Sequence, residues 1–268
     1  MAKLEQSQFR SRVLVAALLV PSIILITWIG GCVFALVVGA AALLATREFF
    51  QLMEKGGFKP LWPMGLALTL LLVLNAFLPN LRLLYPALTA WLIITTVWQL
   101  FRRTSSPVVD WALTLIGGLY IGWFISHFIS LRSLPQGYTW VMLTFLITWA
   151  GDSGAYFAGL KWGKRPFWPR LSPKKTWEGT IGGWVAGVLA AIILGVVGGV
   201  ALPHSLALGV IVATITPFGD LAISMVKRQV GVKDSGTLFP GHGGMLDRVD
   251  SLLFAVVGVY YYVVNVIL

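Results

Sequence analysis

Three aspartates in the C-terminal part of the sequence have the residue type and spacing of a metal site. Asp247 and Asp250 are three residues apart at the start of an apolar segment, so on a helix they would share one face near its positive N-terminal end. Asp220 lies in another apolar segment, where a charge is costly and is by default a functional hypothesis. Such oxygen donors suit Mg²⁺ or Mn²⁺, ions that bind substrate phosphates directly. These three aspartates are therefore the predicted metal ligands, with helix capping as the alternative for Asp247 and Asp250.

Asp152 is a fourth acid in an apolar segment. Its neighbours Gly151 and Gly154 would let a ligand or another backbone come near. Pairing with a buried cation explains Asp152 equally well. We predict that it binds substrate rather than metal.

Basic side chains are interleaved with these acids and with glycines. Lys227, Arg228 and Lys233 follow Asp220, and they could neutralise a polyphosphate, which guanidinium groups grip through two hydrogen bonds. Cations beside membrane segments commonly only set topology or contact headgroups, but this interleaving argues for more. The predicted catalytic residues are Asp220, Lys227, Arg228, Lys233, Asp247 and Asp250.

A glycine-rich stretch runs from Phe239 to Gly244 and could bring several backbone N–H groups to one anion. His242, between two glycines, could donate a proton or contact a phosphate. The sequence contains no Walker phosphate loop, serine nucleophile elbow or kinase signature. Its lone cysteine, Cys32, provides neither a disulfide nor a cysteine metal site.

The elements that must position these residues are membrane helices. Hydrophobic residues make up 57% of the 268-residue chain and charged residues only 11%, which is far from soluble composition. Apolar runs recur at nearly the length that a helix needs to cross a bilayer, and lipid leaves helices as the default spanning structure. We predict an all-α polytopic integral membrane protein with about nine transmembrane helices, near 13–29, 32–52, 61–79, 82–101, 111–131, 138–160, 181–201, 205–225 and 250–268.

The distribution of charge predicts the orientation. All but two of the 20 Lys and Arg residues fall in alternate loops, and this places the N-terminus in the cytoplasm and leaves only Arg82 and Arg132 outside. The acidic residues lie on the same side, so the chemistry is expected to be cytoplasmic and at the cell inner (plasma) membrane. The net charge of +10 is spread between apolar runs, which favours anionic lipids and a polyphosphate over nucleic acid.

Pairs of small residues four apart would let helices pack closely or dimerise. Most such pairs pack one helix against a neighbour in the same chain, so a homodimer stays open as a partner. The pairs are Gly118 with Gly122, Gly183 with Gly187, and Gly195 with Gly199.

The residues from Ser224 to Asp250 resemble the signature of the phosphatidate cytidylyltransferases, also called CDP-diacylglycerol synthases. The run Ser-x-Val-Lys-Arg-x4-Lys-Asp-x-Gly-x2-Phe-Pro-x-His-Gly-Gly-Met-x-Asp-Arg-Val-Asp shows no departure from that pattern. The stretches 152–156 and 172–179 are also similar to the family's, whereas the N-terminal spans match only in hydropathy and length. We therefore expect two regions, an N-terminal set of helices over 1–131 and a catalytic region over 132–268.

The resemblance implies CTP and phosphatidic acid as substrates, a membrane fold that is often dimeric, Mg²⁺ at the aspartates and a potassium ion beside it. The phosphate of phosphatidate would attack the α-phosphorus of CTP and expel pyrophosphate, without a covalent enzyme intermediate. Such transfer depends on positioning and charge stabilisation. The predicted substrate-binding residues are Asp152, Ser172, Lys174, Lys175, Thr176, Glu178, His242, Gly243, Gly244 and Arg248.

Two other functions remain alternatives. A CTP-dependent lipid kinase of the dolichol kinase type would also need metal, a cytidine nucleotide and a membrane lipid. A membrane transporter would have many spans and intramembrane acids. The sequence shows no convincing duplicated half, and a transporter has little reason to concentrate charge on one side.

Overall fold

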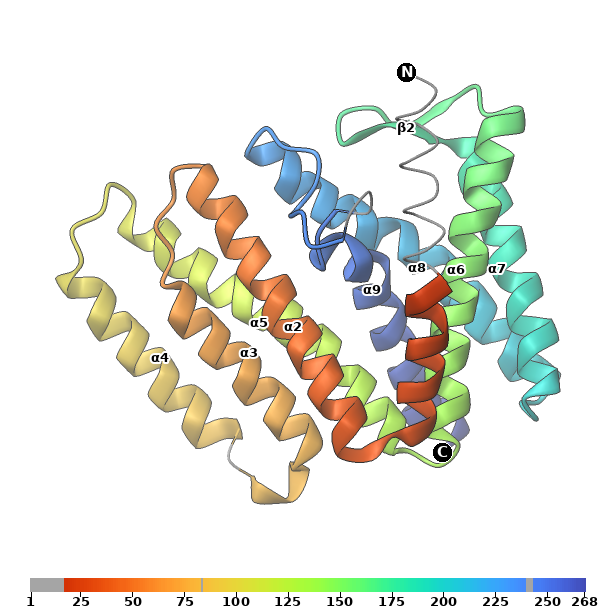
Figure 1. The fold of residues 1–268 in the computed structure, drawn as a ribbon, viewed down its shortest axis with the longest axis horizontal. Coiled ribbons are helices and arrows are strands. Elements are labelled where there is room, and N and C mark those ends of the chain that lie inside the picture. The colour runs from red at the N-terminus through yellow and green to blue at the C-terminus, as the bar shows by residue number, and fades with distance from the viewer. Residues whose placement is uncertain (1–16, 83, 240–242) are drawn as a thin grey trace. The chain divides into compact units, whose positions relative to one another are not determined.

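A computed structural model describes residues 17–82, 84–239 and 243–268. Most of these residues are helical, and each of the nine predicted apolar segments overlaps a helix within its described residues (Figure 1). The elements form two compact units. Unit 1 comprises residues 1–130 and 229–249, and unit 2 comprises 131–228 and 250–268. This division differs from the predicted one in residues 229–249, which group with the N-terminal helices.

Unit 1 is a helical bundle. A helix over Ala17–Ile29 leads into α2 (Gly31–Lys55), and α3 (Trp62–Phe77), the 3₁₀ turn η1 (Pro79–Leu81), α4 (Leu84–Phe101) and α5 (Pro107–Ser133) follow. Figure 1 shows α2, α3, α4 and α5 running side by side. The predicted hairpin of α3 and α4 is confirmed, because the indole Nε1 of Trp91 donates to the backbone O of Met64 at 2.8 Å.

Close packing inside unit 1 depends on glycine. A Cβ on Gly118 would lie 2.6 Å from the backbone O of Gly65, and one on Gly122 would lie 2.8 Å from the Cα of Thr69. Gly118 and Gly122 therefore bring α5 against α3 within the chain. The hydroxyls of Thr46 and Thr69, 3.0 Å apart, join α2 to α3 in the same layer.

Unit 2 contains α6 (Gly137–Trp162), a β-hairpin, α7 (Trp177–Val197), α8 (Leu202–Gln229) and α9 (Leu246–Tyr262), which ends in a π-helical turn over Val263–Ile267. The side chain of Thr176 accepts a hydrogen bond from Gly179 N at 3.2 Å and so caps the N-terminus of α7. Helices α6 and α7 pack through small residues, since a Cβ on Gly183 would lie 2.7 Å from the backbone O of Gly151.

The hairpin consists of β1 (Pro166–Trp168) and β2 (Ser172–Thr176), which pair antiparallel. This hairpin was not predicted from the sequence. Five residues form β2, too few to give a clear alternation of apolar and polar side chains, and their burial pattern is mixed.

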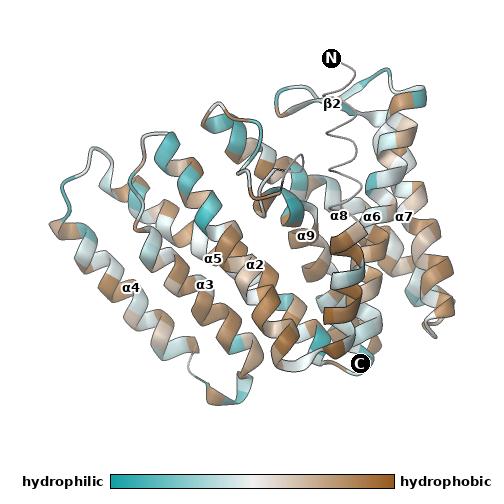
Figure 2. Cartoon of the chain, in the orientation of Figure 1, coloured by the Kyte–Doolittle hydropathy of each residue, from teal (hydrophilic) through white to brown (hydrophobic). Residues whose placement is uncertain are grey.

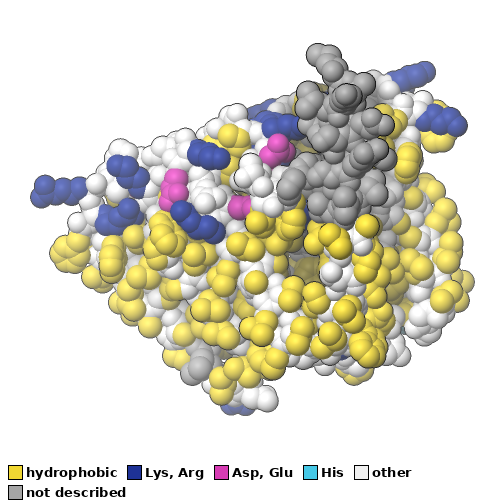
Figure 3. Space-filling view, viewed as in Figure 1, with side chains coloured by type: hydrophobic (Ala, Val, Ile, Leu, Met, Phe, Trp, Pro, Cys, Tyr) yellow, Lys and Arg dark blue, Asp and Glu magenta, His cyan; other side chains and the backbone are white. Residues whose placement is uncertain are grey.

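Six helices are long and apolar enough to cross a membrane, among the residues that the structure describes. They are α2, α4, α5, α7, α8 and the helix from Leu246 to Ile267; shorter apolar helices lie at Ala17–Ile29 and Trp62–Phe77. Hydrophobic residues line these helices, and hydrophilic residues collect at helix ends and in loops (Figure 2). Over α3 and α4 the visible surface is largely hydrophobic, and Lys and Arg gather where α4 leads into α5 (Figure 3). The all-α membrane fold is therefore confirmed.

Candidate active site

The β-hairpin of unit 2 brings a predicted substrate-binding lysine to a predicted metal ligand. The Nζ of Lys175, on β2, lies 2.6 Å from the Oδ2 of Asp220, on α8. Both side chains are about one-third exposed, so the ion pair is accessible from outside the protein. The other oxygen of Asp220 accepts a hydrogen bond from the hydroxyl of Ser224, one helical turn later, at 3.2 Å.

Asp250 belongs to the same charged cluster of unit 2. Its carboxylate interacts electrostatically with Asp220, Lys227 and Asp152. Lys227 is buried, with only 8% of the residue exposed, and its positive charge favours the charged form of Asp250. Gly219 makes room for α9, because a Cβ there would lie 2.6 Å from the backbone O of Asp250. Four residues predicted from the sequence to do chemistry, on three helices, are thus brought together.

Other predicted site residues of unit 2 make local structural contacts. The Nε of Arg228 donates to the backbone O of Leu171, in the turn of the hairpin, at 3.2 Å. The carboxylate of Glu178 accepts hydrogen bonds from the backbone N–H groups of Lys164 and Arg165, at 3.1 and 3.2 Å. Together with the Thr176 cap, these contacts fix the hairpin against α7 and α8. Ser172 and Lys174 lie on β2, with Lys174 exposed.

The signature segment is the part of the 224–250 signature that lies in unit 1, residues 229–249. Two of its residues, Ser235 and Gly244, contact Asp247, in the first turn of α9. Its Oδ2 accepts three hydrogen bonds, from Ser235 N at 2.7 Å, Ser235 Oγ at 2.9 Å and Gly244 N at 3.0 Å. The ends of the glycine-rich stretch are joined, because Phe239 N donates to Gly243 O at 2.9 Å. Asp247 therefore holds the loop that precedes its own helix.

A second acid contacts this segment from far away in the sequence. The carboxylate of Glu48, on α2, accepts hydrogen bonds from Ser235 Oγ, Met245 N and Leu246 N, each at 2.8 Å. No role was predicted for Glu48 from the sequence, beyond its place among the acids on the cytoplasmic side. Glu48 follows Arg47 and precedes Phe49 and Phe50 in a long apolar helix, so the argument that singled out Asp220 applies to it as well.

The remaining predicted site residues differ in exposure and in their contacts. Lys233 and Arg248 are exposed, and Gly243 has a φ of 78°, in the left-handed region that glycine adopts without strain. His242 lies outside the described residues. The N–H of Gly244 donates to Asp247, so the anion that this group contacts belongs to the protein itself.

Unit 2 contains oxygen donors of the type predicted to bind the metal. Nowhere in residues 17–82, 84–239 and 243–268 do three His, Cys, Asp or Glu side chains form a group that could hold a metal ion by themselves. Asp220 and Asp250, however, bring two carboxylates into mutual repulsion. Oxygen ligands from one or two carboxylates, with water and substrate phosphates completing the shell, are what Mg²⁺ accepts in proteins. The two aspartates supply carboxylate oxygens of the kind that such an ion takes, although one oxygen of Asp220 is paired with Lys175.

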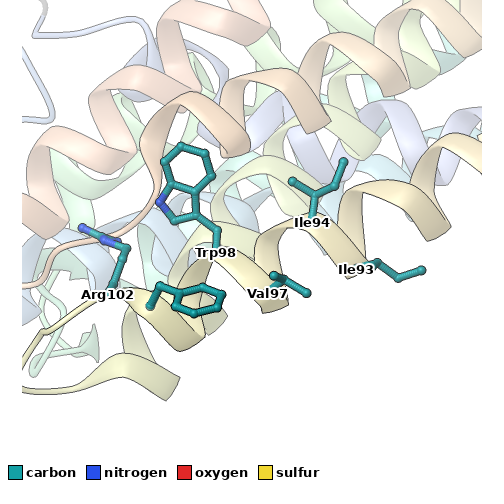
Figure 4. Close-up of a pocket in the computed structure, with 6 residues that line it drawn as sticks. Ile93, Ile94, Val97, Trp98 and Arg102 are labelled. Atoms are coloured by element: carbon teal, nitrogen blue, oxygen red, sulfur yellow. The ribbon is translucent and has the colours of Figure 1, made fainter.

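A pocket of unit 1 lies along α4 (Figure 4). Arg102 gives it one polar corner, and its guanidinium donates to the backbone O of Lys59 at 2.8 Å. The rest of the lining is apolar, as expected of a helix face in contact with lipid tails. The lining residues that the structure describes are Ile93, Ile94, Val97, Trp98, Phe101 and Arg102.

Fold and site together define a class of protein: an α-helical membrane protein that gathers acids and cations suited to phosphate chemistry. The cytidylyltransferase family matches residues 10–266, and the chain belongs to this family. It is similar to a phosphatidate cytidylyltransferase of Synechocystis, with 34% identity over 88% of this chain and 90% of that protein. A Brucella suis phosphatidate cytidylyltransferase is 33% identical over 96% of this chain and 93% of its own length. A Bacillus subtilis phosphatidate cytidylyltransferase is 39% identical over 65% of this chain and 66% of its own length.

Proposed function

We propose that this protein transfers the cytidylyl group of CTP to phosphatidic acid and releases CDP-diacylglycerol and pyrophosphate. The observation that carries the proposal is the cluster of Asp220, Asp250, Asp152, Lys175 and Lys227 in a membrane protein of the cytidylyltransferase family. The reaction joins two anions that repel each other. It therefore needs both positive charge for the phosphates and acids that bind a cation between them.

In the proposed reaction a phosphate oxygen of phosphatidate forms a bond to the α-phosphorus of CTP. The bond from that phosphorus to the bridging oxygen of the β-phosphate breaks, and the oxygen leaves with pyrophosphate. Lys227, buried beside the acids, contributes fixed positive charge to the developing phosphates. Lys175 would exchange its contact with Asp220 for a substrate phosphate. Arg228 and Lys233 would balance the charge of the triphosphate.

Asp220 and Asp250 would hold Mg²⁺ or Mn²⁺ in this proposal, and Asp247 remains the third ligand predicted from the sequence. The bound ion would neutralise phosphate oxygens and orient the attacking and leaving groups. A potassium ion beside it is implied by the family resemblance alone. For the substrate-binding roles, β2 offers Ser172, Lys174 and Lys175, and the signature offers His242, Gly243, Gly244 and Arg248.

The proposal includes a topology. Nine transmembrane helices with a cytoplasmic N-terminus would put the basic loops and the charged cluster at the cytoplasmic face of the inner membrane. CTP is found on that side, and phosphatidate presents its headgroup there. The predicted division at residue 131 puts all of the predicted site residues in the second region. A homodimer is part of the proposal through the family resemblance, and light scattering of the detergent-solubilised protein measures it.

The test is an assay of purified protein with phosphatidate, Mg²⁺ and CTP labelled at either the α- or the γ-phosphate. Cytidylyl transfer puts the α-label into lipid and gives a product with the mass of CDP-diacylglycerol. Entry of the γ-label instead would identify a lipid kinase. Label that crosses proteoliposome membranes without a new lipid product would indicate a transporter, and either result would overturn the proposal.

A further inference from the structure

We propose that Glu48 is a positioning residue, which holds the signature segment and the first turn of α9 in the geometry that the reaction needs. The proposal rests on the proposed function, because it assigns Glu48 a role in that same reaction. Glu48 lies in the N-terminal helices, outside the residues that carry the family resemblance. Its contacts reach Ser235, 187 positions away, and Leu246, 198 positions away.

The carboxylate of Glu48 supplies what the N-terminus of α9 lacks. The first N–H groups of a helix have no partner within the helix, and their partial positive charges favour an anion. Glu48 Oε1 accepts from Met245 N, and Oε2 accepts from Leu246 N, the first residue of α9. A side chain of α2 thus caps α9. The carboxylate is only 8% exposed, so water does not readily take its place.

Two glycines of the signature allow this approach. A Cβ on Gly236 would lie 2.8 Å from Glu48 Oε1, and a Cβ on Gly244 would collide with Glu48 Oε2. Any side chain at Gly244 would therefore displace the carboxylate or the loop. The need for a close approach to Glu48 gives these two glycines a physical reason that does not involve substrate.

Ser235 links Glu48 to a predicted catalytic residue. Its hydroxyl lies 2.8 Å from Glu48 Oε2 and 2.9 Å from Asp247 Oδ2. A hydroxyl has one hydrogen, so the two carboxylates share one donor. Displacement of Glu48 would therefore be passed to Asp247, through Ser235 and through the backbone of the first turn of α9.

The test compares Glu48→Gln with wild type in three measurements: kcat and KM for both substrates, thermal stability in detergent, and hydrogen exchange of peptides covering 235–250. A Gln side chain has one acceptor oxygen, so at least one of the N–H groups of Met245 and Leu246 loses its partner. We expect kcat to fall about 10- to 100-fold, because a small misplacement of the reacting groups lowers the rate by that much. We expect KM to change little, and exchange to accelerate in 235–250 while other helices keep their protection.

The matched control is Glu54→Gln, on the same helix. Glu54 is exposed, and its carboxylate contacts Arg47 at 3.4 Å on the surface, so this variant should retain wild-type kcat and exchange. Should Glu48→Gln not fold, Ser235→Ala replaces it. This variant removes the shared hydroxyl and keeps the backbone bonds, and we expect kcat to fall several-fold with faster exchange in 243–249.

The outcomes separate the two proposals. Wild-type kcat in Glu48→Gln, or in Ser235→Ala if only that variant folds, would show that the network does not position the site. A loss of kcat accompanied by lost protection throughout the protein would show a purely structural role and would equally overturn the inference. Absence of CDP-diacylglycerol from the wild-type assay would overturn the proposed function instead, and the exchange measurement would still report whether Glu48 orders the signature segment.

Discussion

The ammonium of Lys175 is paired with the carboxylate of Asp220 at 2.6 Å, so a residue of the β-hairpin lies where a metal or a phosphate is expected to act. The pair joins two sequence stretches that are 45 positions apart. In the proposed reaction, the Lys175 ammonium would leave Asp220 when substrate binds and return to it between turnovers. Because of this ion pair, activity should depend strongly on the residue at position 175.

Lys175→Met should lower kcat/KM at least about tenfold, because breaking a partly buried ion pair leaves Asp220 without its compensating charge. Lys161→Met is the control, since Lys161 is exposed and lies over the ring of Trp162, with its Nζ 5.0 Å from the ring centroid. Initial rates with phosphatidate and CTP measure both variants. Equal rates for the two would contradict the role of Lys175.

Asp250→Asn should lower kcat at least about 100-fold and raise the Mg²⁺ concentration needed for half-maximal activity, because the amide keeps the volume and removes the charge that binds a cation. The measurement is a Mg²⁺ titration at saturating CTP. Chelation by EDTA should abolish the activity of the wild-type protein. Unchanged Mg²⁺ dependence in Asp250→Asn would remove Asp250 from the predicted ligands.

Gly182→Leu should destabilise unit 2 by about 1–3 kcal/mol or more, because a Cβ at Gly182 already collides with the Cβ of Ala158 on α6. Leu189→Ala provides the control, since Leu189 is on the same helix and its side chain is exposed. Thermal unfolding in detergent, followed by circular dichroism, measures both. Equal stability of the two variants would mean that α6 and α7 do not pack through these small residues.

Arg82→Gln should leave turnover unchanged, because Arg82 is predicted to face the side opposite the chemistry. Both side chains carry a Cβ, so the backbone φ of 50° at this position disfavours them equally. The topology is measured separately. In a Cys32→Ser background, a single cysteine at position 82 should react with an impermeant maleimide in intact spheroplasts, and one at position 103 should react only after permeabilisation. The reverse pattern would invert the predicted orientation.

Local sequence determines much of the helical fold and part of the candidate site. Apolar run length decides that residues such as those of α7 form a membrane helix, whatever their neighbours are. Acids in apolar segments directed attention to Asp220, and the structure surrounds it with other charges. The hairpin of α3 and α4 was also predictable, because the short break between the two helices forces them to lie antiparallel and side by side.

Only the tertiary structure decided which partner each charged residue has. Spacing placed Asp247 and Asp250 on one helix, but it gave no sign that Asp247 is bound to Ser235 and Gly244. The pairing of Glu48 with the start of α9 is likewise absent from any local pattern, since it depends on how α2 packs against a segment almost 200 residues later. Hydropathy and motif spacing act along the chain, whereas hydrogen bonds and ion pairs depend on side-chain directions that packing alone determines.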